Sequence, residues 1–256
     1  LPPNEVKESR LSLNNVSVKN DSDTLAVDNV SFEVRAGEIL GIAGVSGNGQ
    51  REMAQAIAGL RPITSGKVTI SGKDLTNAPP SERFTAGLGY VPEDRLGVGL
   101  APRLTVTENA ILRCYKSLRK SIFLVSEQAV NYCKEIIDRF GVRTGPIDEP
   151  IAGLSGGNLQ RLLVGRELSG NPKVVLAAQP TRGLDVQGVK AIQDLLIDER
   201  AEGVAVLLIS EDLDELLTLS DRLLVMHEGE IVKEFDPTTA HRHEIGAAMA
   251  GKRDES

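Results

Sequence analysis

The sequence contains no tryptophan, and aromatic residues make up only 3% of its 256 residues. It has two cysteines, Cys114 and Cys133, whose spacing matches neither a metal site nor a C-x-x-C redox motif. Isolated thiols of this kind are typical of proteins in a reducing cytoplasm. Because so few aromatic residues are available for packing, the composition favours an aliphatic α/β core over a β-sandwich.

Long hydrophobic runs and an excess of basic charge are lacking as well. No apolar stretch approaches the ~18–20 residues that a transmembrane helix needs, although 41% of the residues are hydrophobic. The formal net charge is −7 and the basic residues are dispersed, so the chain has no global positive field of the kind that attracts nucleic acid. The composition is that of a globular chain, large enough for one substantial core or two small ones.

Two kinds of strand pattern are present. Residues 10–19 and 26–37 alternate apolar and polar side chains, which is typical of half-buried antiparallel strands. Residues 38–44, 173–178 and 204–210 are nearly continuous apolar runs, as in strands that are buried on both faces of a parallel sheet. We therefore expect an antiparallel region at the start of the chain and a buried parallel sheet.

Segments with helical spacing of apolar residues alternate with the buried runs, at 50–60, 186–203 and 214–220. Strands that alternate with helices predict a parallel sheet with right-handed crossover connections. Between about residues 104 and 168 helical patterns occur with few strand signals, which predicts an all-helical insertion. Residues 221–235 indicate a hairpin that turns at HEGE.

A glycine-rich segment follows the first buried run. Residues 44–51 read GVSGNGQR and have the glycine spacing of the phosphate-binding P-loop, G-x-x-x-x-G-K-[ST]. The lysine of that pattern reaches the phosphates and the hydroxyl ligates Mg²⁺, but Gln50 and Arg51 stand in their places. Main-chain N–H groups could still bind phosphate weakly, although on this pattern alone a structural turn explains the glycines equally well. The candidate residues are Gly44, Ser46, Gly47, Asn48, Gly49, Gln50 and Arg51.

A second motif, LSGGNLQR, spans residues 154–161. Ser155 has the position of a helix N-cap, ahead of two glycines and a helical pattern of leucines. Free N–H groups and the positive end of the helix dipole would form a ready anion site there. The sequence VVLAAQPTRGLD follows at residues 174–185.

Together these motifs resemble the ATP-binding cassette (ABC) family, and the resemblance extends from about residue 10 to residue 235. It implies an α/β fold, in which a P-loop NTPase core with a parallel sheet carries an antiparallel β-subdomain and an inserted all-helical subdomain. We accordingly expect a nucleotide-binding domain at residues 10–248, with its helical subdomain at about 104–168. Residues 1–9 would be a linker from a missing N-terminal cassette, and residues 249–256 a polar tail.

The resemblance also implies that catalytic groups are missing. The family's P-loop lysine, its Asp-Glu strand end and its switch histidine correspond to Gln50, Ala178, Gln179 and Glu211. No aromatic residue precedes Phe32, so the ring that stacks on adenine near residues 18–20 is missing too. A single lost electrostatic contact can cost on the order of 10²–10³ in rate. With several lost together, we expect no intact catalytic residue, no bound metal, and weak or absent ATP binding at this loop.

Glu93 stands where the family usually has a glutamine, after GYVP. The resemblance implies either a contact with the nucleotide or metal at the chain's own loop or a position that faces a permease. Both interpretations are open at this point.

The other half of the family's machinery is intact in the sequence. The signature and D-loop positions match the family at Ser155, Gly156, Gly157, Asn158, Gln160 and Asp185. Family members act as head-to-tail pairs, in which each ATP lies between one domain's P-loop and the other's signature. The resemblance therefore implies that this chain supplies its signature to a partner's ATP–Mg²⁺ site.

Three segments, GEILGIAGVSGNGQ, GLGYVPEDR and PTRGLDVQG, resemble the second cassette of the tandem ATPases of sugar and nucleoside importers. The loss of both acids at residues 178–179 favours the nucleoside systems that are served by a lipoprotein receptor. The implied partners are an N-terminal cassette of the same polypeptide, transmembrane permease subunits near residues 90–115 and, indirectly, a substrate-binding lipoprotein. The implied location is the cytoplasmic face of the membrane.

Two alternatives compete with this interpretation. A self-sufficient ATPase would use Arg51 and Glu93 as unusual substitutes and would turn over ATP alone. A soluble ABC protein that acts on nucleic acid would carry basic arms or a zinc module, and the acidic sequence shows neither, so we expect no nucleic-acid partner.

Overall fold

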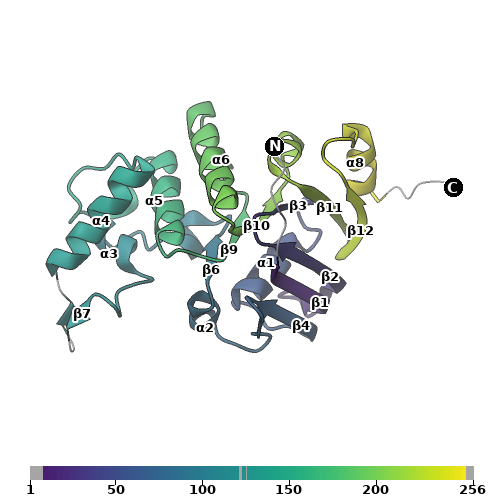
Figure 1. Ribbon diagram of the computed structural model, residues 1–256, viewed down its shortest axis with the longest axis horizontal. Coiled ribbons are helices and arrows are strands. Elements are labelled where there is room, and N and C mark those ends of the chain that lie inside the picture. The colour runs from purple at the N-terminus through teal and green to yellow at the C-terminus, as the bar shows by residue number, and fades with distance from the viewer. Residues whose placement is uncertain (1–7, 121–122, 125, 252–256) are drawn as a thin grey trace. The chain divides into compact units, whose positions relative to one another are not determined.

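The computed structural model describes residues 8–120, 123–124 and 126–251 (Figure 1). The chain divides into two compact units. The first consists of the chain up to Tyr90, Lys173–Gln179 and the chain from Leu195 onward; the second consists of Val91–Pro172 and Pro180–Asp194. Most of the expected linker and tail lies outside the described residues, but Ser9 already belongs to the first strand, so the expected linker ends before it.

An antiparallel sheet opens the first unit, as the alternating segments predict. Its strand order is β2-β1-β4-β5, and its core-facing side chains, such as Leu11 and Val34, are fully buried. In the ribbon β1, β2 and β4 lie side by side (Figure 1). The strands are β1 (Ser9–Lys19), β2 (Leu25–Arg35), β4 (Ser65–Ile70) and β5 (Lys73–Asp74).

The second sheet contains the continuous apolar runs. Its order is β12-β11-β3-β10-β9-β6, and every residue of its three central strands β3, β10 and β9 is buried. Strand β10 pairs in parallel with β3 and β9, while β12 pairs antiparallel with β11. The strands are β3 (Ile39–Ala43), β6 (Leu88–Val91), β9 (Val174–Ala178), β10 (Ala205–Ser210), β11 (Arg222–His227) and β12 (Glu230–Phe235).

Helix α1 (Gln50–Ala58) joins the cores of the two sheets. It contacts strands of both, and Met53 and Ile57 are fully buried among side chains from each sheet. Leu60, which completes the apolar pattern in the sequence, is 50% exposed because the helix ends at Gly59. The other helices of this unit are α2 (Pro80–Thr85), α7 (Leu213–Leu219) and α8 (Arg242–Met249), and α6 (Val186–Ala201) is divided between the two units.

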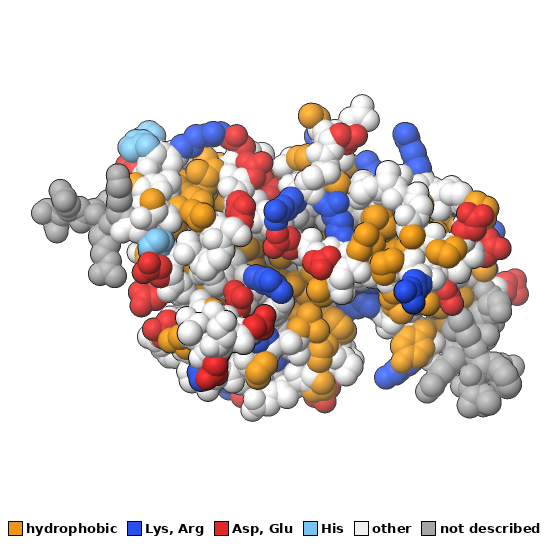
Figure 2. Space-filling view, turned by 180° about the vertical axis from the view of Figure 1, so that it is seen from behind, with side chains coloured by type: hydrophobic (Ala, Val, Ile, Leu, Met, Phe, Trp, Pro, Cys, Tyr) orange, Lys and Arg blue, Asp and Glu red, His pale blue; other side chains and the backbone are white. Residues whose placement is uncertain are grey.

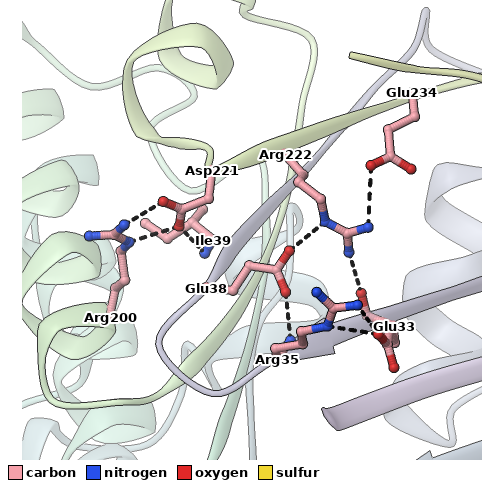
Figure 3. Close-up of polar contacts among 8 residues, drawn as sticks. All are labelled: Glu33, Arg35, Glu38, Ile39, Arg200, Asp221, Arg222 and Glu234. Carbon is pink, nitrogen blue, oxygen red and sulfur yellow. Dashed lines mark hydrogen bonds and ion pairs between the residues drawn. The ribbon is translucent and has the colours of Figure 1, made fainter. Parts of the chain in front are cut away.

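An ion-pair network fixes the amino-terminal end of strand β3 (Figure 3). The Glu38 carboxylate, only 1% exposed, accepts hydrogen bonds from the Arg222 side chain at 2.6 Å and from the Arg35 N–H at 2.7 Å. Asp221 accepts from the Ile39 N–H at 2.8 Å and forms an ion pair with Arg200. Since β3 leads directly into the glycine-rich loop, these contacts set the register of the strand that carries it.

The second unit is mostly helical, as predicted, but not entirely. A short antiparallel pair, β7 (Arg119–Lys120) and β8 (Phe123–Leu124), interrupts the segment from 104 to 168 and corrects the prediction of an all-helical insertion. The helices are η1 (Arg95–Gly99, a π-helix), α3 (Val106–Ile111), α4 (Ser126–Phe140), η2 (Ile151–Gly153) and α5 (Gly156–Leu168).

A local sequence signal explains where helix α3 begins. Thr105 and Glu108 form a reciprocal capping box at the start of α3, a pattern that is visible in the sequence TVTE.

Helix α5 is buried on nearly all sides, and Arg166 within it bonds Glu167 and the Gly99 carbonyl. None of the helices that the structure describes combines the length and hydrophobicity needed to cross a bilayer.

Candidate functional site

The strand register brings three candidate segments to one edge of the second sheet. Ala43 at the end of β3 pairs with Ser210 at the end of β10, and Ile209 pairs with Ala178 at the end of β9. The glycine-rich loop, Glu211 and Gln179 therefore follow the carboxyl ends of neighbouring parallel strands, where ligands bind in open α/β sheets.

Gln50 turns back onto the loop that precedes it. Its side-chain N–H donates to the Val45 carbonyl at 3.2 Å. A methyl group added at Gly44 would lie 2.0 Å from the same nitrogen, so the amide covers the start of the loop. A lysine at this position would carry a full positive charge to a phosphate, whereas the amide of Gln50 carries none.

Arg51 acts on a carboxylate of the β1–β2 turn. The pKa of Asp21 is held below its ordinary value chiefly by its hydrogen bond and ion pair with Arg61, and the charge of Arg51 lowers it further. Arg61 also bonds the Lys19 carbonyl at 3.0 Å and so fixes the turn. Arg51 thus adds, after Arg61, to the positive charge that acts on Asp21.

The loop is also tied to the turn between β11 and β12, a feature that the sequence did not reveal. The Asn48 side-chain oxygen accepts from the Glu228 N–H, and its main-chain oxygen accepts from the Gly229 N–H, both at 3.1 Å. Gly49 has φ +98°, and a methyl group there would lie 2.0 Å from the Ala26 carbonyl oxygen, so only glycine fits. These contacts hold the loop in one conformation.

Gln179 and Glu211 lie together at the ends of β9 and β10. Gln179 has φ +51°, its N–H bonds the Ile209 carbonyl at 2.8 Å, and its side-chain oxygen is 3.4 Å from the Glu211 N–H. In P-loop NTPases Mg²⁺ is held by a loop hydroxyl and a strand-end carboxylate. Arg51 and Ala178 stand in those places and offer no side-chain oxygen, so these two residues do not fit the metal.

The signature segment forms the start of α5 in the second unit. Ser155 is the N-cap residue, as predicted. Its hydroxyl accepts from the Asn158 side-chain N–H at 2.9 Å, and the Asn158 side-chain oxygen accepts from the Arg143 N–H at 2.8 Å. Ser155, Gly156 and Asn158 are thereby presented in a fixed turn at the positive end of a 13-residue helix.

A cavity of about 550 Å³ brings the signature and the D-loop position together. Its walls include Ser155, Gly157, Asn158 and Asp185, and Asp185 caps α6 by accepting from the Gly188 N–H at 2.7 Å. Gln160, 1% exposed, does not line the cavity; its side-chain N–H bonds the Pro180 carbonyl at 2.6 Å. Gln160 therefore links the signature helix to the turn that leads to Asp185.

Glu93 lies in the second unit and forms an ion pair with Arg182. Arg95, two residues further on, donates to the main-chain carbonyl of Arg182. Nothing in the sequence motifs predicts this pairing. A role for Glu93 in nucleotide binding stays a prediction.

A model of the family described as "ABC transporter" matches residues 27–182. The chain belongs to the ABC transporter family. Among curated ABC proteins it is 44% identical, over 96% of its own length, to the glucose import ATP-binding protein TsgD13 of Haloferax volcanii. It is 40% identical, again over 96% of its length, to the nucleoside import ATP-binding protein NupA of Lactococcus lactis subsp. cremoris.

The chain covers 46% and 49% of these two ABC proteins, so it spans about half the length of the curated relatives it matches. Among solved structures, a dimeric post-hydrolysis state of the ATP-binding cassette MJ0796 with ADP and Pi has a TM-score of 0.76 and 25% identity. That likeness covers 89% of this chain and 98% of the other. The fold is that of an ABC cassette, with a P-loop NTPase core, a mixed sheet and an antiparallel β-subdomain, as the motifs predicted.

Proposed function

We propose that this chain is the catalytically degenerate nucleotide-binding domain of an ABC importer for nucleosides or sugars. Its own P-loop does not hydrolyse ATP, and its signature completes the ATP site of a partner cassette. The observation that carries the proposal is the contrast between two groups of residues. The loop edge is the P-loop with the adjoining ends of β9 and β10, and the signature edge is the start of α5 with Asp185. The loop edge lacks the family's lysine and strand-end carboxylates, while the signature edge keeps Ser155, Asn158 and Asp185 around one cavity.

The loop edge supports the inactive half of the proposal. Phosphoryl transfer depends on positioning and on charge stabilisation by a lysine, Mg²⁺ and a residue that orients the nucleophile. Gln50 is neutral and bonded to the loop, the charge of Arg51 helps to lower the pKa of Asp21 in the β1–β2 turn, and Gln179 bonds the main chain of Glu211. Main-chain N–H groups can hold a nucleotide weakly, without turnover.

The signature edge supports the active half. Free N–H groups at a helix start favour phosphate, and the hydrogen bonds of Asn158 fix Ser155 in the turn that presents them. Gln160 bonds the adjoining turn at Pro180, and Asp185 caps the helix that follows this turn. A partner's ATP, bound to the partner's own P-loop with Mg²⁺, would meet this turn as the second wall of its site.

Import and its partners are proposed from the relatives. Two of them are named for glucose and nucleoside import, and both are about twice as long as this chain. This favours a second cassette on the same polypeptide, with permease subunits and a substrate-binding lipoprotein beyond it, at the cytoplasmic face of the membrane. Exposed hydrophobic side chains between residues 91 and 115 would suit a permease contact: Leu96, Val98, Leu112 and Tyr115.

Neither the net charge nor the face drawn in Figure 2 favours a nucleic-acid partner. Figure 2 shows acidic and basic side chains interspersed over the face that it draws, and the net charge is −7. Binding to the phosphate backbone needs clustered positive charge.

The test is a calorimetric titration of ATP–Mg²⁺ into the purified domain, with phosphate release followed on the same sample. We expect weak or undetectable binding and no turnover above the protein-free rate. Binding without turnover would indicate a regulatory nucleotide site. Phosphate release that disappears on substitution of Gln50 or Arg51 would instead establish a self-sufficient ATPase.

A further inference from the structure

Two segments of the second unit meet at Arg182: the turn that contains it and residues 91–99. The Arg182 guanidinium forms an ion pair with Glu93, and its main-chain carbonyl accepts from the Arg95 guanidinium. One short segment, residues 91–99, therefore holds Arg182 by both its side chain and its backbone. We call these two contacts the Arg182 clasp.

One end of the clasp, Arg182, lies in the turn that borders the signature cavity. Pro180, two residues before Arg182, accepts a hydrogen bond from buried Gln160 of α5. Asp185, three residues after it, lines the cavity and caps α6. A methyl group added at Gly156 would lie 3.5 Å from a guanidinium nitrogen of Arg95, so Arg95 also borders the first turn of α5.

The other end of the clasp is an exposed apolar turn. Residues 95–99 form the π-helix η1, which Asp94 caps by accepting from the Gly97 N–H at 2.8 Å. Leu96 and Val98 in this turn are 42% and 49% exposed. π-Helical turns are rare and frequently occur at functional sites. A protein surface that covered Leu96 and Val98 would contact the same turn that carries Arg95.

We propose that Arg182 is a positioning residue that links occupancy of the 91–99 segment to the geometry of the signature edge. The inference rests on the proposed function, in which that edge completes a partner's ATP site. The side chains of Arg182 and Glu93 are 60% and 40% exposed. Exposed ion pairs of this kind add little to stability, so the clasp can form and break at a small cost in free energy. When it does, Asp185 and the start of α5 shift together with Arg182 and Arg95.

The first experiment uses this chain alone. Amide hydrogen exchange at Leu184 and Gly188 is compared in the unsubstituted chain, in Glu93→Gln, and in Glu93→Arg combined with Arg182→Glu. We expect exchange to become about two- to fivefold faster in Glu93→Gln and to return toward the original rate in the reversed pair. An exposed ion pair changes the equilibrium between closed and open states by less than about tenfold, and the exchange rate follows that equilibrium. Lys190→Gln, which breaks the exposed ion pair with Asp194, is the matched control and should leave Leu184 unchanged.

The second experiment uses the complete transporter, with partner cassette and permease in vesicles. Glu93→Gln should lower the permease-stimulated kcat for ATP by about the same two- to fivefold factor and leave KM unchanged, since the loop that binds ATP lies on the partner. The reversed pair should restore kcat. An effect of Glu93→Gln on exchange that stays within residues 91–99, or an unchanged kcat, would overturn the clasp. If ATP turnover by the complete transporter did not depend on Ser155, the proposed function would be refuted instead. The exchange measurement on this chain alone would still decide whether the clasp acts on Leu184 and Gly188.

Discussion

The side-chain amide of Gln50 donates to the main-chain carbonyl of Val45, 3.2 Å away. The residue at the lysine position of the phosphate loop is thus engaged by the loop itself. A neutral amide in this arrangement satisfies a loop carbonyl but gives a phosphate no charge.

Restoring the P-loop pattern with Gln50→Lys and Arg51→Thr should raise affinity for ATP–Mg²⁺ by about tenfold or more, since a hydrogen bond to a charged group contributes about 1.5–3 kcal/mol. Turnover should stay at background, because Ala178 and Gln179 supply no carboxylate at the strand end. Calorimetry and phosphate release measure both. Arg51→Thr alone is the control and should gain less affinity. Clear turnover in the double variant would show that lost loop residues alone explain the inactivity.

Arg83 should be essential for the stability of the first unit. Its side chain is 1% exposed and bonds four main-chain carbonyls, among them Ala56 and Ile57 at the carboxyl end of α1. Arg83→Met would leave these acceptors buried without their donor, at a cost of about 3 kcal/mol. Urea unfolding measures the loss, and Arg103→Met, at an exposed position, should change stability by less than about 0.5 kcal/mol. Equal effects of the two substitutions would refute this role.

The second unit should lose stability at high pH. Burial, together with the neighbouring Cys114, raises the pKa of Tyr132 from its ordinary 10.0 to about 12. The folded state therefore favours the protonated phenol, so the stabilising contribution is complete below pH 10 and is lost as pH rises toward about 12. An absorbance titration should show a phenolate step near pH 12 that disappears in Tyr132→Phe. A titration complete by pH 11 would contradict the burial of this ring.

The sequence predicted the fold because its signals are local and agree with one another. Continuous apolar runs become β3, β9 and β10, which are buried on both faces, and the alternating segments become β1 and β2. The β7–β8 pair was missed, since two-residue strands carry no periodicity that a sequence pattern can show.

The candidate site was predicted in part. The signature motif predicted Ser155 at the N-cap, whereas the strand register of the folded chain shows that Gln179 and Glu211 follow neighbouring strand ends. The contacts between Asn48 and Glu228 and between Glu93 and Arg182 join residues that are far apart in sequence. No single-sequence pattern encodes which charged side chains meet across such separations, and only the folded chain shows them.

The most direct test of the central claim compares Ser155→Ala with Gln50→Ala in the complete two-cassette transporter. Thermal unfolding first confirms that both variants fold; because the Ser155 side chain makes no cap hydrogen bond, its loss should cost less than the roughly 1 kcal/mol of a typical N-cap. ATP turnover should then fall on the order of 10²-fold or more in Ser155→Ala and far less in Gln50→Ala. An equal or larger loss in Gln50→Ala would show that this chain's own loop carries the chemistry and would contradict the account.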